Sequence, residues 1–318
     1  ELKRELTIVG QTVGENGGSL IEANFDGKAN GLTAFQIKST AKNSNISNIY
    51  LKNSTTDNTT VNGIGNVGDS LALTHFNMID VWVVGFTANF HFEKIYLSRF
   101  NRCYAINGYY GFNFLGECTS LIFDGCYGNK NTDNYRMQGV LYSSFISCAN
   151  DGALRYGYEL TNCRGLAFVG CGVETAAETA VKLTSGNRGI HFQALFTHNC
   201  GATNTSMGSM FQIENGNYGI VIDSAYEYTV SDQTAKTLSI IAGKDTSVTI
   251  NSATTILPIV KNVPSMVIDG IRKSNIVPNG GAFKQGDFVY NSNFSGTGVY
   301  AFMCTVAGTP GTWVQLSV

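Results

Sequence analysis

Short segments in which apolar and polar residues alternate recur along most of the chain. One six-residue pattern occurs three times, as Leu121-Ile-Phe123-Asp-Gly-Cys126, Ser143-Ser-Phe145-Ile-Ser-Cys148 and Leu166-Ala-Phe168-Val-Gly-Cys171. Alternation with a period of two residues is typical of β-strands. The closing cysteines recur every 22 to 23 residues, and a repeat of this length, made of strands and small-residue turns, is typical of a solenoid. The pattern therefore predicts stacked coils with equivalent strands.

The same template continues on both sides of the triple repeat. Further copies cover residues 92–100, 181–195, 211–225 and 259–271, and shorter strands at 6–9, 19–23, 34–37 and 46–51 read as the first coils. Each unit reads as strand, tight turn, strand and then an excursion of variable length. We interpret residues 52–69, rich in Asn, Thr and Gly, as a surface loop. Residues 71–86 fit either a coil or an insertion packed on the outside.

We expect an all-β fold, a right-handed parallel β-helix over residues 1–272. The expected inward column is Phe100, Cys126, Cys148, Cys171, Leu195 and Ala225. The alternative is a β-sandwich with similar strands, and the matched cysteines favour the helix. From Lys273 the pattern changes to antiparallel strands at 286–290 and 299–304, with a turn at 308–312. Residues 273–318 therefore read as a small β module that caps the open end of the helix.

Composition narrows the class of protein. Only 14% of residues are charged, and the chain has 36 glycines but only four prolines. This composition is typical of a turn-rich β chain. The net charge of −2 without a basic block argues against nucleic-acid binding. No apolar run is long enough for a membrane helix, and residues 1–6 do not resemble a signal peptide. The chain reads as a piece of a longer protein.

The eight cysteines are expected to be free. Stacked strands lie about 4.8 Å apart, which does not match disulfide geometry, so cysteines at the coil period act as small apolar fillers. Free buried thiols indicate assembly in a reducing cytoplasm. No C-x-x-C pair is present, and we expect no metal and no cofactor.

The end of the chain gives the sharpest motif. A pectate-lyase-like β-helix followed by Gly286-Asp-Phe-Val-Tyr290 and by Cys304-Thr-Val-Ala-Gly-Thr-Pro-Gly-Thr-Trp313 resembles bacteriophage tailspike or tail-fibre receptor-binding proteins. The resemblance implies a homotrimer that binds, and often cleaves, bacterial surface polysaccharide such as capsule, exopolysaccharide or O-antigen. It also implies a place in the virion tail after assembly in the host cytoplasm.

The candidate chemistry comes from counting along the repeat. Three residues after each cysteine position stand Asn129, Asp151, Glu174, His198 and Tyr228. Neighbouring members of this column should lie about 5 Å apart, which suits the paired carboxylates of a glycosidase. Asp151 and Glu174 are therefore the leading catalytic pair, with His198 tuning or sharing the proton. The alternative is a solvated row of polar turns.

Other residues are candidates for binding the substrate. Arg136 and Arg155 could hold a sugar carboxylate, or could form surface salt bridges. Asp223 and Glu227 form a second possible pair, although Asp223 aligns with Asp124 and Asp269, which favours a structural role. Glu178 could share one face of a short helix with Glu174. The tyrosines of the central coils, Tyr156 among them, could stack on sugars or make core or trimer contacts.

Three functions are compatible with these residues. The first is a glycoside hydrolase that uses Asp151 and Glu174. The second is a polysaccharide lyase, in which His198 or a tyrosine abstracts a proton and an arginine neutralises a uronate. The third is a non-enzymatic adhesin. No Ser-His-Asp pattern or phosphate-binding loop is present.

Overall fold

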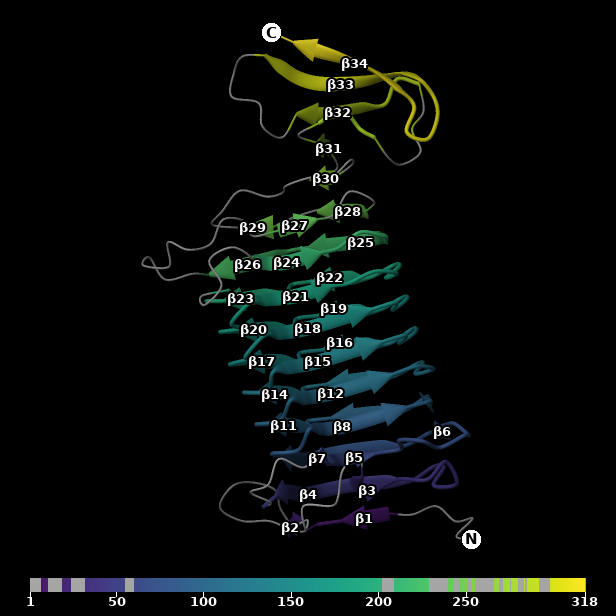
Figure 1. Ribbon diagram of the computed structural model, residues 1–318, viewed down its shortest axis with the longest axis vertical. Helices are drawn as coiled ribbons and strands as arrows, with labels where there is room; N and C mark the ends of the chain where they lie inside the picture. The colour runs from purple at the N-terminus through teal and green to yellow at the C-terminus, as the bar shows by residue number, and fades with distance from the viewer. Residues whose placement is uncertain are drawn as a thin grey trace.

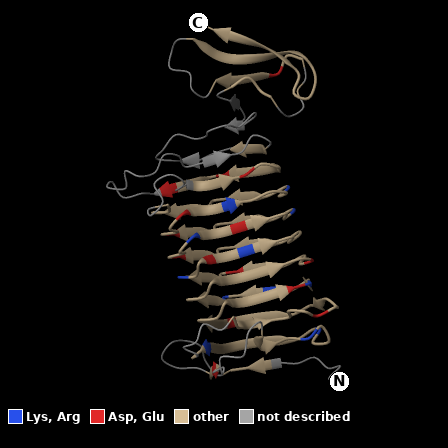
Figure 2. Ribbon diagram, viewed as in Figure 1, with Lys and Arg blue, Asp and Glu red and all other residues tan. Residues whose placement is uncertain are grey.

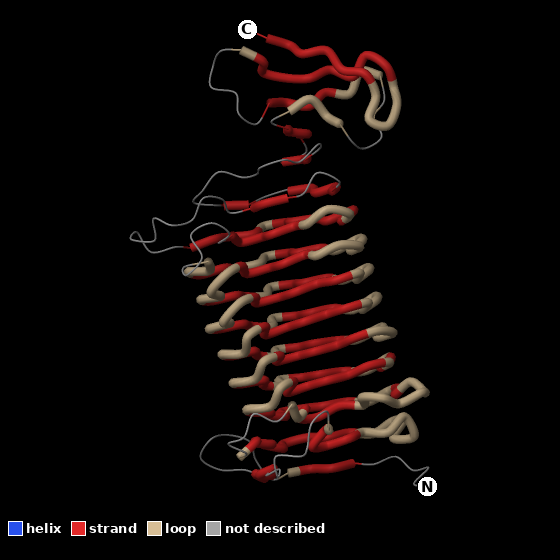
Figure 3. The backbone as a smooth tube through the Cα atoms, in the orientation of Figure 1, coloured by secondary structure: helices blue, strands red, loops and turns tan. Residues whose placement is uncertain are grey.

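The computed structural model consists of stacked coils of β-strands that rise along one long axis (Figure 1). The described residues contain strands, turns and loops and no helix (Figure 3). The structure describes residues 7–10, 19–23, 32–54, 60–201, 209–228, 240–242, 246–250, 253–254, 266–268, 271–274, 276–279, 283, 285–291 and 298–317.

Each regular coil contributes one strand to each of three faces. In the coil that contains Cys126, face 1 is β13 (Ile122–Asp124), face 2 is β14 (Tyr127–Asn129) and face 3 is β15 (Asp133–Gln138). Each of these strands pairs in parallel with its equivalent in the next coil. The parallel β-helix predicted from the sequence is confirmed.

The strands of each face are as follows. Face 1 comprises β1 (Thr7–Val9), β10 (Arg99–Asn101), β13, β16 (Ser144–Ile146), β19 (Ala167–Val169), β22 (His191–Gln193), β25 (Asn217–Asp223), β28 (Thr246–Ile250) and β30 (Met266–Ile268). Face 2 comprises β2 (Ser19–Ala23), β11 (Tyr104–Ile106), β14, β17 (Ala149–Asp151), β20 (Gly172–Glu174), β23 (Phe196–His198), β26 (Ala225–Tyr228) and β29 (Ala253–Thr254). Face 3 comprises β3 (Thr33–Gln36), β5 (Asn62–Gly65), β8 (Ala88–Glu93), β12 (Tyr110–Leu115), β15, β18 (Tyr156–Thr161), β21 (Thr179–Leu183), β24 (Ser209–Ile213) and β27 (Ile240–Ala242). The longer strands β4 (Asn45–Asn53) and β7 (Asn77–Val84) extend through faces 1 and 2, and β6 (Leu73–Thr74) pairs with β9 (Ile95–Tyr96) at a corner.

Single residues with left-handed backbone turn the chain from one face to the next. Gly125 (φ 59°) separates face 1 from face 2, Lys130 (φ 53°) separates face 2 from face 3, and Gly139 (φ 73°) ends face 3. Glycine adopts this conformation at little steric cost, and other residues adopt it less readily. The corners are therefore tight, and the long excursion expected after the second strand is wrong for these coils, where a short corner leads directly into face 3.

A column of phenylalanine rings fills the interior behind face 1. Phe100, Phe123, Phe145, Phe168 and Phe192 are each fully buried and stand on consecutive strands. Their rings stack at centroid distances of 4.4–5.1 Å with interplanar angles of 0–17°. Face-3 aromatic rings meet them edge to face, as Tyr135 does with Phe145 at 6.1 Å and 81°. Repeated ring contacts of this kind hold one coil in register with the next.

The cysteine column lies beside the phenylalanine column. It begins at Cys103, because Tyr104 and Tyr127, the residues that follow Cys103 and Cys126, are register partners. The expected position of Phe100 at the head of this column is therefore wrong, since Phe100 pairs with Phe123. All eight cysteines are buried and free. The thiols of Cys126, Cys148 and Cys171 can each donate to the carbonyl of a phenylalanine one coil earlier, as Cys126 does to Phe100 at 3.2 Å.

The coils before residue 100 are more regular than the sequence suggested. Within the expected surface loop at 52–69, β5 is a fully buried strand of face 3, so that interpretation is wrong there. The segment 71–86 is a coil, because β7 pairs with β4 on one side and with β10 and β11 on the other. Its Trp82 points outward and stacks on Tyr104 at 4.4 Å.

The C-terminal strands form a small module with a core of its own. β31 (Ile271–Ser274) leads into β32 (Phe288–Asn291), β33 (Val299–Val306) and β34 (Thr312–Ser317), and the last three pair antiparallel. Phe283, Val289, Phe302 and Cys304 are buried together, and Trp313 packs against them. The expected terminal β module is confirmed, while its boundary at residue 272 stays a prediction.

We predict that Phe145→Ala lowers the free energy of unfolding by about 3–5 kcal/mol, because it opens a cavity between two stacked rings. Chemical denaturation measures the loss. The neighbouring Ile146 is 40% exposed, so Ile146→Ala should change stability by less than about 0.5 kcal/mol. Equal losses for both variants would contradict the stacked interior.

We also predict that the native thiols are unreactive. Burial raises the pKa of Cys118 to about 12 and that of Cys163 to about 11, and the thiolate is the reactive form. At about pH 8, a disulfide reagent should detect no thiols in the native protein and all eight after denaturation. Rapid labelling of the native protein would show that the cysteine column is accessible.

Candidate active site

Face 2 presents two columns of outward side chains that run along the axis. We call the first the aromatic column: Tyr50, Trp82, Tyr104, Tyr127, Ala149, Gly172, Phe196 and Tyr226. We call the second the polar column: Asn129, Asp151, Glu174, His198 and the strand position of Tyr228. The residues between them, such as Asn150 and Val173, are buried. Strand alternation therefore places both columns on the outer surface.

The polar column stands in the register that the sequence count anticipated. Asn129 pairs with Asp151, Asp151 with Glu174, and Glu174 with His198. Adjacent strands are about 4.8 Å apart, so the two carboxylates occupy neighbouring coils on one face. Asn129 lies one coil before them and His198 one coil after.

Hydroxyl groups hold the carboxylate of Asp151. The Tyr127 hydroxyl donates to Oδ2 at 3.3 Å, and the Thr175 hydroxyl donates to Oδ1 at 2.8 Å. Thr175 Oγ1 in turn accepts the Gly152 N–H at 3.0 Å. Burial, and then the negative charge of Asp151, raise the pKa of Tyr127 to about 12, so this phenol stays protonated and remains a donor. Asp151 is thus fixed in orientation at both oxygens.

Glu174 is the more exposed of the two carboxylates. Its side chain is 55% exposed, whereas Asp151 is half-buried. Glu174 Oε2 lies 4.0 Å from Nδ1 of His198, whose side chain is 30% exposed. The Glu174 charge also contributes to the raised pKa of Tyr127. Tyr127, Asp151, Glu174 and His198 therefore belong to one electrostatic group.

The aromatic column is interrupted beside the two carboxylates. Its rings stop at Tyr127 and resume at Phe196, which stacks on Tyr226 at 5.8 Å and 9°. Ala149 and Gly172 stand between. A Cβ at Gly172 would meet nothing closer than 3.9 Å, and the φ of Gly172 is not positive, so the fold does not require a glycine there. Two coils next to Asp151 and Glu174 therefore carry no ring in this column, and we call this stretch the open floor. It lies between Tyr127, which is half-buried, and Phe196, which is 40% exposed.

The residues expected to bind substrate on face 3 form an ion-pair network. Arg155 donates to both carboxylate oxygens of Asp133, a side chain with no exposed surface. Arg136 Nε lies 3.5 Å from Glu159 Oε2, and Arg155 lies 3.8 Å from the same carboxylate. Arg136, Glu159 and Lys182 alternate in sign along β15, β18 and β21 (Figure 2). The salt-bridge alternative is thus the observed state of both arginines.

Tyrosine rings cover this network. The Arg136 guanidinium lies 4.7 Å from the Tyr110 ring centroid, and that of Arg155 lies 4.6 Å from the Tyr156 centroid. Burial raises the pKa of Glu159, and the charge of Asp133 adds to the shift. Burial and the nearby Glu178 carboxylate raise the pKa of Tyr156 to about 12. These contacts give the two arginines and Tyr156 structural partners on face 3.

Two expectations about carboxylates need correction, and a third can be checked in part. Residues 174–180 do not form a helix: Glu174 ends β20, Thr175 turns the corner, and Glu178 lies across that corner beside Tyr156. Glu227 faces the interior and is only 1% exposed, so it does not form an outer pair with Asp223. The expected alignment of Asp223 with Asp124 is confirmed, since both lie in one column on face 1, while Asp269 lies outside the described residues.

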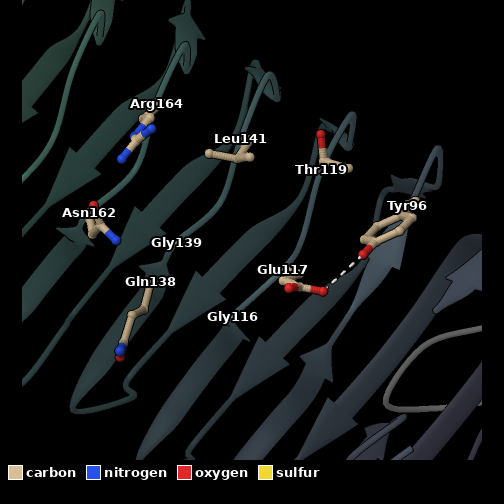
Figure 4. Close-up of a pocket in the computed structure, with 9 residues that line it drawn as sticks. All are labelled: Tyr96, Gly116, Glu117, Thr119, Gln138, Gly139, Leu141, Asn162 and Arg164. Atoms are coloured by element: carbon tan, nitrogen blue, oxygen red, sulfur yellow. Dashed lines mark hydrogen bonds between the residues drawn. The ribbon is translucent and has the colours of Figure 1, made fainter. Parts of the chain in front are cut away.

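A cavity that the sequence did not indicate lies at the corner after face 3. It measures about 670 Å³ and is lined by Tyr96, Gly116, Glu117, Thr119, Gln138, Gly139, Leu141, Asn162 and Arg164 (Figure 4). A smaller hollow of about 470 Å³ lies over face 1 around Arg99 and Asp124. Within the described ranges, no cluster of His, Cys, Asp and Glu is arranged to hold a metal ion. The same described ranges also contain no helix that could cross a membrane.

Comparison with solved structures places this architecture among known β-helices. The gp42 tailspike of Acinetobacter phage vb_AbaP_AS12 matches 87% of this chain with a TM-score of 0.58 and 13% identity, and the match covers 65% of that tailspike. The chain has the fold of a phage tailspike. The resemblance stated from the sequence is thus confirmed at the level of the fold.

Two further structures are similar at lower TM-scores. Tailspike protein 2 of the Escherichia coli O157:H7 bacteriophage CAB120 matches 79% of this chain and 38% of its own, at a TM-score of 0.48 and 14% identity. The A-module of the Azotobacter vinelandii mannuronan C-5 epimerase AlgE6 matches 83% of this chain and 91% of its own, at 0.43 and 12%. No protein-family model and no curated protein sequence matches the chain.

We predict that the face-3 network is structural. Asp133→Asn should lower the free energy of unfolding by about 2–3 kcal/mol, since it removes the charge of the buried carboxylate that accepts two hydrogen bonds from a partly buried guanidinium. The matched control is Asp80→Asn, which breaks a bidentate pair with Arg102 whose side chains are 55% and 29% exposed; it should cost less than about 1 kcal/mol. Equal costs in thermal or chemical unfolding would contradict a buried role for Asp133.

Proposed function

We propose that this chain is the receptor-binding part of a phage tailspike that binds and cleaves bacterial surface polysaccharide by glycoside hydrolysis. The observation that carries the proposal is the pair of neighbouring carboxylates beside the open floor at Ala149 and Gly172. Phe196 at one end of this floor is exposed and Tyr127 at the other end is half-buried, and an aromatic face of this kind can stack on a sugar. A sugar ring seated there has its glycosidic bond next to Asp151 and Glu174.

The spacing of the carboxylates supports a retaining reaction. Neighbouring strands are about 4.8 Å apart, and retaining glycosidases hold their two carboxyl groups about 5–5.5 Å apart. Asp151, oriented by Tyr127 and Thr175, is the nucleophile that attacks the anomeric carbon. Glu174 protonates the departing glycosidic oxygen. Water activated by Glu174 then hydrolyses the glycosyl ester on Asp151, which restores both groups.

His198 assists the proton transfer in this scheme. Its Nδ1 lies 4.0 Å from Glu174 Oε2, close enough for the imidazole to exchange a proton with that carboxylate after a small movement. Hydrolysis is favoured over a lyase reaction because a lyase needs a cation to neutralise the uronate. Arg136 and Arg155, the arginines expected for that role, are already paired with Glu159 and Asp133.

The remaining elements of the proposal concern assembly. We propose a homotrimer in the virion tail, assembled in the host cytoplasm. Eight free, buried thiols suit a chain that folds in a reducing compartment. The proposed partners are bacterial polysaccharide and two further copies of the chain, with neither nucleic acid nor membrane insertion involved.

We predict that Asp151→Asn and Glu174→Gln each lower polysaccharide cleavage by about a thousandfold or more, since each removes one member of a two-carboxylate mechanism. The assay counts new reducing ends after incubation with surface polysaccharide from a susceptible host. Asp124→Asn, an exposed carboxylate on face 1, is the matched control and should leave the rate unchanged.

The outcomes separate the functions. Binding without product from the wild-type protein would make it an adhesin. Products with an unsaturated sugar would make it a lyase. Cleavage that survives both substitutions would place the active site elsewhere on the molecule.

A further inference from the structure

The cavity of Figure 4 lies at the opposite edge of face 3 from the polar column. It begins where β12 and β15 end, at the corner that leads back to face 1. The six-residue strands of face 3 separate the two corners by about 20 Å. Residues from four successive coils line it, so it runs along the axis of the helix as a groove.

Two left-handed glycines form the floor of this groove. The corner position after face 3 is occupied in successive coils by Lys94, Gly116, Gly139 and Asn162, all with positive φ. Only Gly116 and Gly139 lack a side chain, so the surface is lowered over two coils and raised at each end. A Cβ at Gly139 would lie 2.7 Å from the Gly116 carbonyl oxygen, so the fold itself maintains this depression.

The walls carry groups that recognise a polar ligand. A column of bridge residues, Tyr96, Thr119, Leu141 and Arg164, forms one side. The Tyr96 hydroxyl donates to Glu117 Oε2 at 3.3 Å at one end of the groove, while Asn162 and Arg164 stand at the other end (Figure 4). The Gln138 amide lies between these ends, so hydrogen-bonding side chains line the groove along its length.

The Arg164 guanidinium is the charge in this groove that is available to a ligand. Arg164 is exposed, and in the part of the chain that the structure describes its side chain forms no ion pair or hydrogen bond. Arg136 and Arg155 differ, because both are paired with carboxylates of face 3. A guanidinium binds a carboxylate through two parallel hydrogen bonds. An acidic substituent is therefore the ligand group that fits this end.

We propose that this groove is a second saccharide-binding site, which holds an acidic segment of the polysaccharide without cleaving it. The inference rests on the proposed function for its ligand class. Arg164 binds the acidic group, while Glu117, Gln138 and Asn162 bind sugar hydroxyls. Glu117 is the one carboxylate that lines the groove, so the two-carboxylate chemistry of the polar column is absent here. The site retains the polymer near the cleavage site.

The test uses a cleavage-deficient Asp151→Asn background, so that binding is measured without turnover. An array of bacterial surface oligosaccharides, acidic and neutral, serves as the probe. Arg164→Gln should weaken binding to the acidic members by about tenfold or more, since it removes a charge-assisted pair. Arg188→Gln is the matched control: it is the register partner of Arg164 in the next coil but lies outside the groove. It should stay within about twofold of the background variant, because it touches no ligand.

The possible outcomes are distinct. Unchanged acidic-glycan binding in Arg164→Gln, equal losses in both arginine variants, or binding to neutral members alone would overturn the second site. In an otherwise wild-type protein, Arg164→Gln should raise KM for long polymer and leave kcat unchanged. If cleavage depends on Asp151 and binding does not depend on Arg164, the proposed function is supported and the second site is rejected. If binding depends on Arg164 and no polysaccharide is cleaved, the second site is supported and the proposed hydrolysis is rejected.

Discussion

The register between coils is the constraint on which the rest of the structure depends. Between residues 99 and 228, parallel pairing aligns each strand with its equivalent 22 to 30 residues later. A shift of one residue would turn every side chain to the opposite face. Stacked phenylalanines from Phe100 to Phe192 oppose such a shift, because each ring fits only between its two neighbours. The thiols beside them can donate to carbonyls of the preceding coil, which links the coils further.

A fixed register turns the outer surface into columns. Residues that are far apart in sequence, such as Asp151 and Glu174, become neighbours because they hold the same position in successive coils. Surface features are then made by changing single positions within a column. Replacing rings with Ala149 and Gly172 opens a floor in the aromatic column, and placing Gly116 and Gly139 side by side lowers a groove at another corner. The rigid interior permits such changes because it does not use these side chains.

Much of the fold could be predicted from the sequence because the repeat is carried by buried residues. The alternation around Cys126, Cys148 and Cys171 identified the coils, and the count from each cysteine identified the polar column. Cys103 was missed although it stands 23 residues before Cys126, because Phe100 is an apolar residue close to the same position and also fits an inward column. The third strand of each coil was partly missed because tight corners of one left-handed residue leave little trace in sequence.

The surface was harder to predict than the interior. Glu227 was expected outside, yet strand alternation places it on the inner side because the preceding Tyr226 faces outward. The pairing of Arg155 with Asp133 crosses from one coil to the previous one, and side-chain contacts of that kind depend on the exact corner geometry. The groove around Arg164 depends on backbone conformation at two glycines, so residue types alone did not indicate it.

The stereochemistry of the first product tests the central claim most directly. Proton NMR during cleavage reports whether the newly released sugar keeps the anomeric configuration of the bond that was broken. Carboxylates on neighbouring coils predict retention, through a glycosyl ester on Asp151. Release of the inverted anomer, or of an unsaturated sugar, would contradict the assignment of Asp151 and Glu174 as nucleophile and acid.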